Sequence, residues 1–157
     1  MADDLKEMSR MALMEMFDRG HPEILANVAW LSFIGHDPVR GTLSLGETRD
    51  LAKGFKAGFP DLHCIVLDAI SEGGRVACRW RMEGTHRGSF LGFEPTGHRV
   101  VLEGIGFFRF HGDRVAEEWL EYDAFGLLRQ LGVVPTMDDL RKQHADETAA
   151  GGAYTSH

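Results

Sequence analysis

The chain has 157 residues, 43% of them hydrophobic and 26% charged, which is typical of one soluble globular domain. Its formal net charge of −7 disfavours polyanionic partners, so we expect it to bind neither nucleic acid nor an anionic membrane surface. No apolar run approaches the ~20 residues that cross a membrane. The acidic N-terminus is unlike a signal peptide, and the cytoplasm is therefore the expected location.

Two helices are predicted at the start of the chain. Residues 3–19 place apolar side chains at helical spacing, and Gly20 suits the position just after a helix. Pro22 suits the first position of a second, short helix. Residues 28–34 have no clear period, and residues 35–38, Gly-His-Asp-Pro, have the composition of a turn.

Two more helices and four strands are predicted further along the chain. Residues 44–58 begin with a capping-box pattern and should form a helix, as should residues 123–131 before Gly132. The four strands are expected over residues 62–71, 75–87, 99–111 and 115–123. We expect one domain, residues 1–134, followed by a polar extension, residues 135–157, that is partly mobile.

The alternation of side chains along two strands predicts which residues line a pocket. In the strand over residues 75–87, the apolar side chains fall on one face, and Trp80 and His86 belong to that face. In the last strand, Trp119 and Asp123 share a face because they are an even number of residues apart. We therefore predict a pocket built between these four side chains.

Four short stretches together resemble the SnoaL-like polyketide cyclases. They are Phe-Pro-Asp-Leu at 59–62, the Gly-Thr-His-Arg-Gly to Pro-Thr-Gly segment at 84–97, Glu-Trp at 118–119, and Asp-Ala-Phe-Gly-Leu-Leu-Arg-Gln-Leu-Gly at 123–132. The resemblance spans roughly residues 10–132. It implies the α+β cone of the nuclear-transport-factor-2-like superfamily, in which a curved antiparallel sheet surrounds a pocket and helices close the mouth. The family usually associates through the outer face of the sheet, so a homodimer or a larger homo-oligomer is expected.

The resemblance also implies a reaction and its catalytic groups. The family carries out an intramolecular aldol cyclisation of an apolar, carbonyl-bearing polyketide ester by acid–base catalysis, without a metal or another cofactor. Asp123 stands where the family's catalytic aspartate lies, and His86 and His36 would orient it or hydrogen-bond the developing enolate. Trp80, Trp119, Phe107 and Trp30 would contact the substrate.

Several alternatives stay open at this stage. Asp123 also suits the N-cap of the helix that follows it, and His36 suits a loop histidine bound to neighbouring backbone. A metal held by His36, His86 and Asp123 is a further alternative.

Two departures from the family pattern bear on the reaction. Leu120 stands where relatives often carry a polar residue. Phe107 and Phe108 stand in the region of the third strand where cyclases can carry a polar substrate-binding group. An apolar pocket with one acid also suits isomerisation, dehydration or epoxide opening. A non-catalytic protein that binds a small molecule on the same scaffold is the second class of function.

Overall fold

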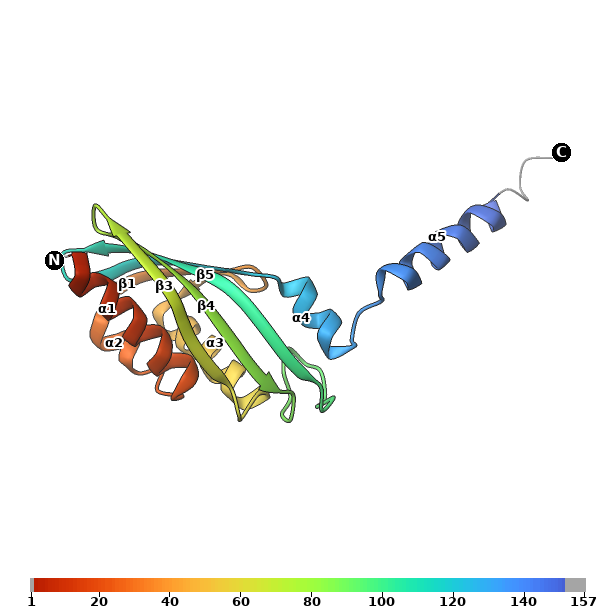
Figure 1. Ribbon diagram of the computed structural model, residues 1–157, viewed down its shortest axis with the longest axis horizontal. Coiled ribbons are helices and arrows are strands. Elements are labelled where there is room, and N and C mark those ends of the chain that lie inside the picture. Colours follow the sequence, from red (N-terminus) through yellow and green to blue (C-terminus); the bar gives the residue numbers. More distant parts are fainter. Residues whose placement is uncertain (1, 152–157) are drawn as a thin grey trace.

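The computed structural model describes residues 2–151, which form a curved, six-stranded sheet with helices on its concave face (Figure 1). The strand order is β2-β1-β6-β5-β4-β3, and every neighbouring pair is antiparallel except β1 and β6, which run parallel. The predicted α+β cone is thus confirmed, with one parallel pair in its sheet. In chain order the elements are α1 (Ala2–Leu13) with a π-helical continuation η1 (Met14–Asp18), α2 (Ile24–Val28), β1 (Ala29–Asp37), β2 (Gly41–Ser44), α3 (Leu45–Gly58), β3 (His63–Glu72), β4 (Arg75–Thr85), β5 (Arg99–His111), β6 (Arg114–Tyr122), α4 (Ala124–Leu131) and α5 (Met137–Gly151).

Local signals fix the ends of two helices that shape the cone. Ser44 accepts a hydrogen bond from the Glu47 backbone N–H, and the Glu47 carboxylate accepts one from the Ser44 N–H, so the predicted capping box forms. α4 ends at Gly132, which adopts φ +74°, a left-handed conformation that glycine reaches without steric cost. These caps fix where α3 begins and where α4 ends.

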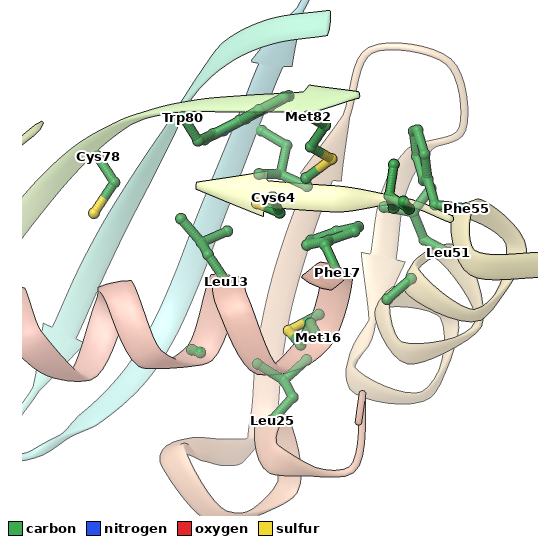
Figure 2. Packing of buried hydrophobic residues seen from close by; sticks show 14 of the residues in the cluster. Leu13, Met16, Phe17, Leu25, Leu51, Phe55, Cys64, Cys78, Trp80 and Met82 are labelled. Atoms are coloured by element: carbon green, nitrogen blue, oxygen red, sulfur yellow. The ribbon is translucent and has the colours of Figure 1, made fainter. Parts of the chain in front are cut away.

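The core lies between the sheet and the helices α1 and α3. Figure 2 shows Leu13 and Phe17 directed toward the strand residues Cys64 and Trp80, and Phe55 approaching from α3. Trp80 is 1% exposed, and its indole lies over Gly104, where any Cβ would collide with the ring. The mid-strand glycine therefore provides space for a large aromatic side chain.

Both cysteines are buried thiols in this core. Cys78 pairs with Ala69 across the β3–β4 hairpin, as predicted, and this register keeps it away from Cys64. Burial is the main cause that raises the pKa of Cys64 to about 12 and that of Cys78 to about 11. Neither thiol is a reactive nucleophile at neutral pH.

A bulge in β6 corrects the predicted pocket. Arg109 pairs with Glu117 whereas Phe110 pairs with Val115, so Ala116 is one extra residue in the β6 ladder. An extra residue reverses the alternation of side chains beyond it. Val115 faces the interior, but after the bulge the even-numbered residues, such as Glu118 and Leu120, face it instead of the odd-numbered ones. The prediction that Trp119 and Asp123 face the interior with Trp80 and His86 is therefore wrong.

The segment over residues 28–34, which has no clear period in the sequence, contributes most of β1. Its pairing with β6 is irregular between Ala29 and Ile34, and the exposure along the strand does not alternate there. Because periodicity is the main local signal of a strand, such an irregular strand escapes prediction. The turn predicted at 35–38 begins after Asp37, since His36 and Asp37 still belong to β1.

Beyond α4 the chain leaves the cone. α5 has no buried residue and extends away from the sheet (Figure 1). The division after residue 134 stays a prediction, and the mobility predicted for the C-terminal end falls partly on residues 152–157, which lie outside the described residues. No helix within residues 2–151 is both long and apolar enough to span a membrane.

Candidate functional site

Six aromatic rings run through the interior of the cone. Trp80 and Tyr122 have ring centroids 6.2 Å apart at one end, and Phe59 and His86 have centroids 5.5 Å apart at the other. Phe55 and Phe90, with centroids 5.0 Å apart, connect the two ends through contacts with Tyr122 and Phe59. The concave face thus offers a large apolar wall in which polar atoms are few.

A cavity beside this wall, lined by two of the six rings, Phe55 and Phe59, is nearly filled by side chains. It offers about 10 Å³ to the centre of a water-sized sphere, which is room for about one water molecule. A drug-sized ligand occupies at least about 300 Å³. Side chains must therefore move before such a ligand can enter. The cavity is lined by Phe55, Phe59, Leu62, Met82, Glu83, Gly84, Val100, Leu102 and Leu127.

Two ring N–H groups in this interior have no hydrogen-bond partner within residues 2–151. They are Nε1 of Trp80 and Nε2 of His86, which is 0% exposed. His86 Nδ1 accepts a hydrogen bond from the Thr96 backbone N–H at 3.2 Å, so in the neutral ring the proton is on Nε2. A buried donor without a partner costs about 1–3 kcal/mol, which a ligand acceptor would recover.

An acid lies in the interior near Trp80, but it is not the predicted one. The Tyr122 hydroxyl donates to Asp37 Oδ2 at 2.8 Å, and Asp37 is 5% exposed. The other carboxylate oxygen accepts from the backbone N–H groups of Val39 and Arg40. Burial is the largest cause that raises the pKa of Tyr122, followed by the nearby Asp37 carboxylate, so the tyrosine keeps its proton. Asp37 and Tyr122 form a proton-bearing pair beside the indole of Trp80.

Glu118 is a second buried acid on the concave face. It is 2% exposed and lies opposite the buried Phe108 of β5. Burial raises its pKa to about 8, so the protonated form predominates at neutral pH. Neither Glu118 nor the Asp37–Tyr122 pair was predicted, because only the register of β6 reveals that these side chains point inward.

Three of the predicted site residues lie together on the outer face. The His36 ring stacks on Trp119 with centroids 5.0 Å apart, and Phe107 packs edge-on against Trp119 at 5.8 Å. His36 Nε2 lies 2.9 Å from Glu117, which also accepts from Arg109 at 2.9 Å. The predicted placement of His36, Trp119 and Phe107 in the pocket is thus wrong.

The two remaining predicted residues lie outside the cone interior. Asp123 is exposed, and its carboxylate accepts from the Gly126 N–H at 2.7 Å, which is the N-cap arrangement. Trp30 is 39% exposed and donates its ring N–H to the His111 carbonyl. The structure therefore does not bring His36, His86 and Asp123 together around a metal.

Comparisons with known proteins decide the family. A family model described as SnoaL-like polyketide cyclase matches residues 7–131. The chain belongs to the SnoaL-like polyketide cyclase family. No curated protein sequence matches it at a significant level.

Solved structures share the fold of this SnoaL-like chain. AclR from Streptomyces galilaeus, described as a candidate hydroxylase, has 26% identity and a TM-score of 0.75 over 86% of this chain and 100% of its own. A candidate SnoaL-like polyketide cyclase from Jannaschia sp. CCS1 has 19% identity and a TM-score of 0.77 over 85% of this chain and 95% of its own. TsrD from Streptomyces laurentii has 23% identity and a TM-score of 0.74 over 84% of this chain and 97% of its own.

Proposed function

We propose that this SnoaL-like protein binds an apolar, carbonyl-bearing small molecule inside the cone and transforms it by acid–base catalysis. The observation that carries the proposal is the pair of buried, unpartnered donors, Trp80 Nε1 and His86 Nε2, in an aromatic interior. A carbonyl oxygen accepts hydrogen bonds and adds no donor, so a carbonyl complements each of these two groups. Aromatic walls favour a flat, apolar skeleton around such a carbonyl.

The Asp37–Tyr122 pair supplies the proton transfers in this proposal. The carboxylate of Asp37, directly or through the Tyr122 hydroxyl, takes a proton from a carbon next to a substrate carbonyl. The electron pair of the broken C–H bond moves onto the carbonyl oxygen, where the Trp80 N–H stabilises the enolate. In a cyclisation the enolate carbon then bonds to a second carbonyl carbon, and the pair returns the proton to the resulting alkoxide.

Activity measurements on interior and exterior acids test this assignment. With a polyketide ester that contains a methylene between two carbonyls, we expect Asp37→Asn and Tyr122→Phe to lower kcat at least about a hundredfold. Asp123→Asn is the matched control, and we expect its kcat to stay within about threefold of wild type because Asp123 caps α4 outside the cone. Circular dichroism confirms that each variant is folded. Unchanged kcat in both interior variants would contradict the proposal.

A non-catalytic binding protein is the second candidate. Leu120 points into the cone, where it is 4% exposed, and gives that position an apolar side chain instead of a polar one. Asp123, the acid expected from the family resemblance, bonds to a helix N–H and pairs with neither His86 nor His36. Tight ligand binding in the absence of turnover would support this candidate.

We also propose that the protein forms a homodimer or larger homo-oligomer through the outer face of the sheet and acts in the cytoplasm. Apolar side chains are exposed on this face from β1, β3 and β5: Ile34, Ile65, Ile70, Ile105 and Phe107. An extended apolar surface of this kind favours association. We expect Phe107→Glu to give a monomer in light scattering at micromolar concentration, whereas Phe125→Glu, an exposed position on α4, leaves the oligomer intact. A monomeric wild-type protein would contradict this part of the proposal.

A further inference from the structure

The loop between β4 and β5, residues 86–98, crosses the C-terminal end of α3. Its base is fastened, since His86 N–H donates to the His98 carbonyl and Gly97 N–H donates to the His86 carbonyl, both at 2.9 Å. Further along, the N–H groups of Arg87 and Gly88 both donate to the Gly58 carbonyl at 3.0 Å. The loop is thus held against α3 by two backbone hydrogen bonds to one acceptor.

The tip of this loop inserts one aromatic side chain into the cone. Phe90 is 4% exposed, although it lies beyond the end of β4 in a loop. Its ring centroid lies 5.0 Å from that of Phe55, 5.1 Å from that of Phe59 and 6.5 Å from that of His86. Phe55 and Phe59 both line the nearly filled cavity, so Phe90 packs behind its wall, edge-on to the His86 ring.

The backbone at α3 permits this close approach. A Cβ at Gly58 would lie 2.8 Å from the Phe90 Cβ, and a Cβ at Gly88 would collide with the Ala57 carbonyl oxygen. Both positions therefore need glycine for the loop to lie against the helix. The closed arrangement depends on close packing that a small outward movement of the loop would remove.

A tight turn holds Phe90 in place, and that turn carries backbone strain. Phe90 and Phe93 exchange two backbone hydrogen bonds, of 3.1 and 2.9 Å, around Leu91 and Gly92. Both central residues have positive φ, +51° for Leu91 and +80° for Gly92. Glycine adopts this conformation freely, whereas leucine does so at a cost. The strain at Leu91 therefore offsets part of the free energy that the packing of Phe90 contributes to the closed loop.

We infer that Phe90 is the gate and a specificity-determining residue of the interior site, and that residues 87–96 form the lid that carries it. When the lid lifts, the Phe90 ring leaves the rings of Phe55 and Phe59 and opens a way for a ligand into the aromatic interior. The inference rests on the proposed binding of an apolar carbonyl compound in the cone. It explains how a site with room for about one water admits a larger molecule.

Binding of prodan, a neutral naphthyl ketone whose emission shifts with polarity, tests the gate. If the closed lid competes with the ligand, the apparent affinity equals the intrinsic affinity multiplied by the fraction of protein whose lid is open. We expect Phe90→Ala, and more weakly Phe90→Leu, to tighten prodan binding by about tenfold, because both weaken the closed state. The control is Phe93→Ala, in the same turn at an exposed position, which should leave the affinity within about twofold.

Phe90→Ala could bind prodan more tightly either because the lid opens or because the shortened side chain leaves a cavity. A second pair of variants distinguishes these two causes. Gly92→Ala keeps Phe90 but strains the closed turn, since φ is +80° and no atom lies within 4 Å of the added methyl. We expect it to tighten prodan binding about three- to tenfold, the effect of removing part of the closed population. Gly112→Ala is the matched control, because Gly112 has φ +64° and equally open space in the β5–β6 turn.

The outcomes distinguish this inference from the proposed function. Tighter binding in Phe90→Ala and Gly92→Ala but not in Phe93→Ala and Gly112→Ala supports the gate, even if no variant shows turnover. Folded Phe90→Ala and Phe90→Leu proteins that bind prodan no more tightly than Phe93→Ala would overturn it. So would a Gly92→Ala protein whose prodan affinity equals that of Gly112→Ala, whatever the catalytic activity of the wild-type protein.

Discussion

Glu117 and Glu118 are neighbours in the sequence, but β6 directs them to opposite faces of the sheet. On the outer face, Glu117 bonds to His36 and Arg109, and these partners, His36 first, lower its pKa. On the concave face, Glu118 is 2% exposed, and burial raises its pKa to about 8. The outer-face glutamate thus has charged partners within the chain. The interior leaves the ring N–H groups of Trp80 and His86 without partners in residues 2–151, so a ligand there has hydrogen bonds to gain.

The tryptophans repeat this contrast. Trp80 is buried in the cone with a ring N–H that lacks a partner, whereas Trp119 is half-buried on the outer face against His36 and Phe107. Removing the buried ring leaves a cavity in the core, so we expect Trp80→Ala to lower the free energy of unfolding by about 3–5 kcal/mol. Trp119→Ala should cost roughly 1–2 kcal/mol, because less area is buried there. Urea denaturation of both variants measures the difference, and equal losses would contradict the assignment of faces.

The two glutamates predict opposite responses of stability to pH. The pKa of Glu118 is raised in the fold, so its contribution is fully present below about pH 4.5 and is lost as the pH rises through about 8. We expect Glu118→Gln to remove this loss, which is on the order of 5 kcal/mol. The pKa of Glu117 is lowered, so its contribution is present above the unfolded pKa and is lost as the pH falls through the folded value.

Urea denaturation between about pH 3 and pH 9 distinguishes the two variants. Glu118→Gln should flatten the alkaline side of the profile, and Glu117→Gln should alter only the acidic side. If Glu118→Gln lost stability toward alkaline pH as steeply as wild type, Glu118 would not be the buried acid responsible.

The smallest effect concerns Asp123, which caps α4 outside the cone. We expect Asp123→Ala to lower the free energy of unfolding by about 1 kcal/mol through loss of the hydrogen bond from Gly126. Ser44→Ala, at the N-cap of α3, is a matched control with a loss of similar size. Thermal denaturation compares the two variants. A loss several times larger than that of Ser44→Ala would show that Asp123 does more than cap a helix.

Much of the fold could be predicted because its signals are local. The capping box at Ser44, the hairpin after Glu72 and the alternation around Trp80 each lie within a few residues, and each predicted the observed element. The candidate site was less predictable because one extra residue, Ala116, reverses the faces of β6. The contact between Asp37 and Tyr122 joins residues 85 positions apart and depends on the parallel pairing of β1 and β6. No local pattern in the sequence reveals that pairing.

The central claim is that a carbonyl ligand binds on the concave face beside Trp80. The chain has three tryptophans, so a nitrogen-15 NMR spectrum shows three indole N–H resonances, and Trp80→Phe identifies the one from Trp80. On addition of excess prodan, we predict that the Trp80 indole resonance shifts downfield as its N–H gains an acceptor. The resonances of Trp30 and Trp119, outside the cone, should stay in place. A Trp80 resonance that does not move at saturating prodan, or shifts confined to Trp30 and Trp119, would contradict the claim.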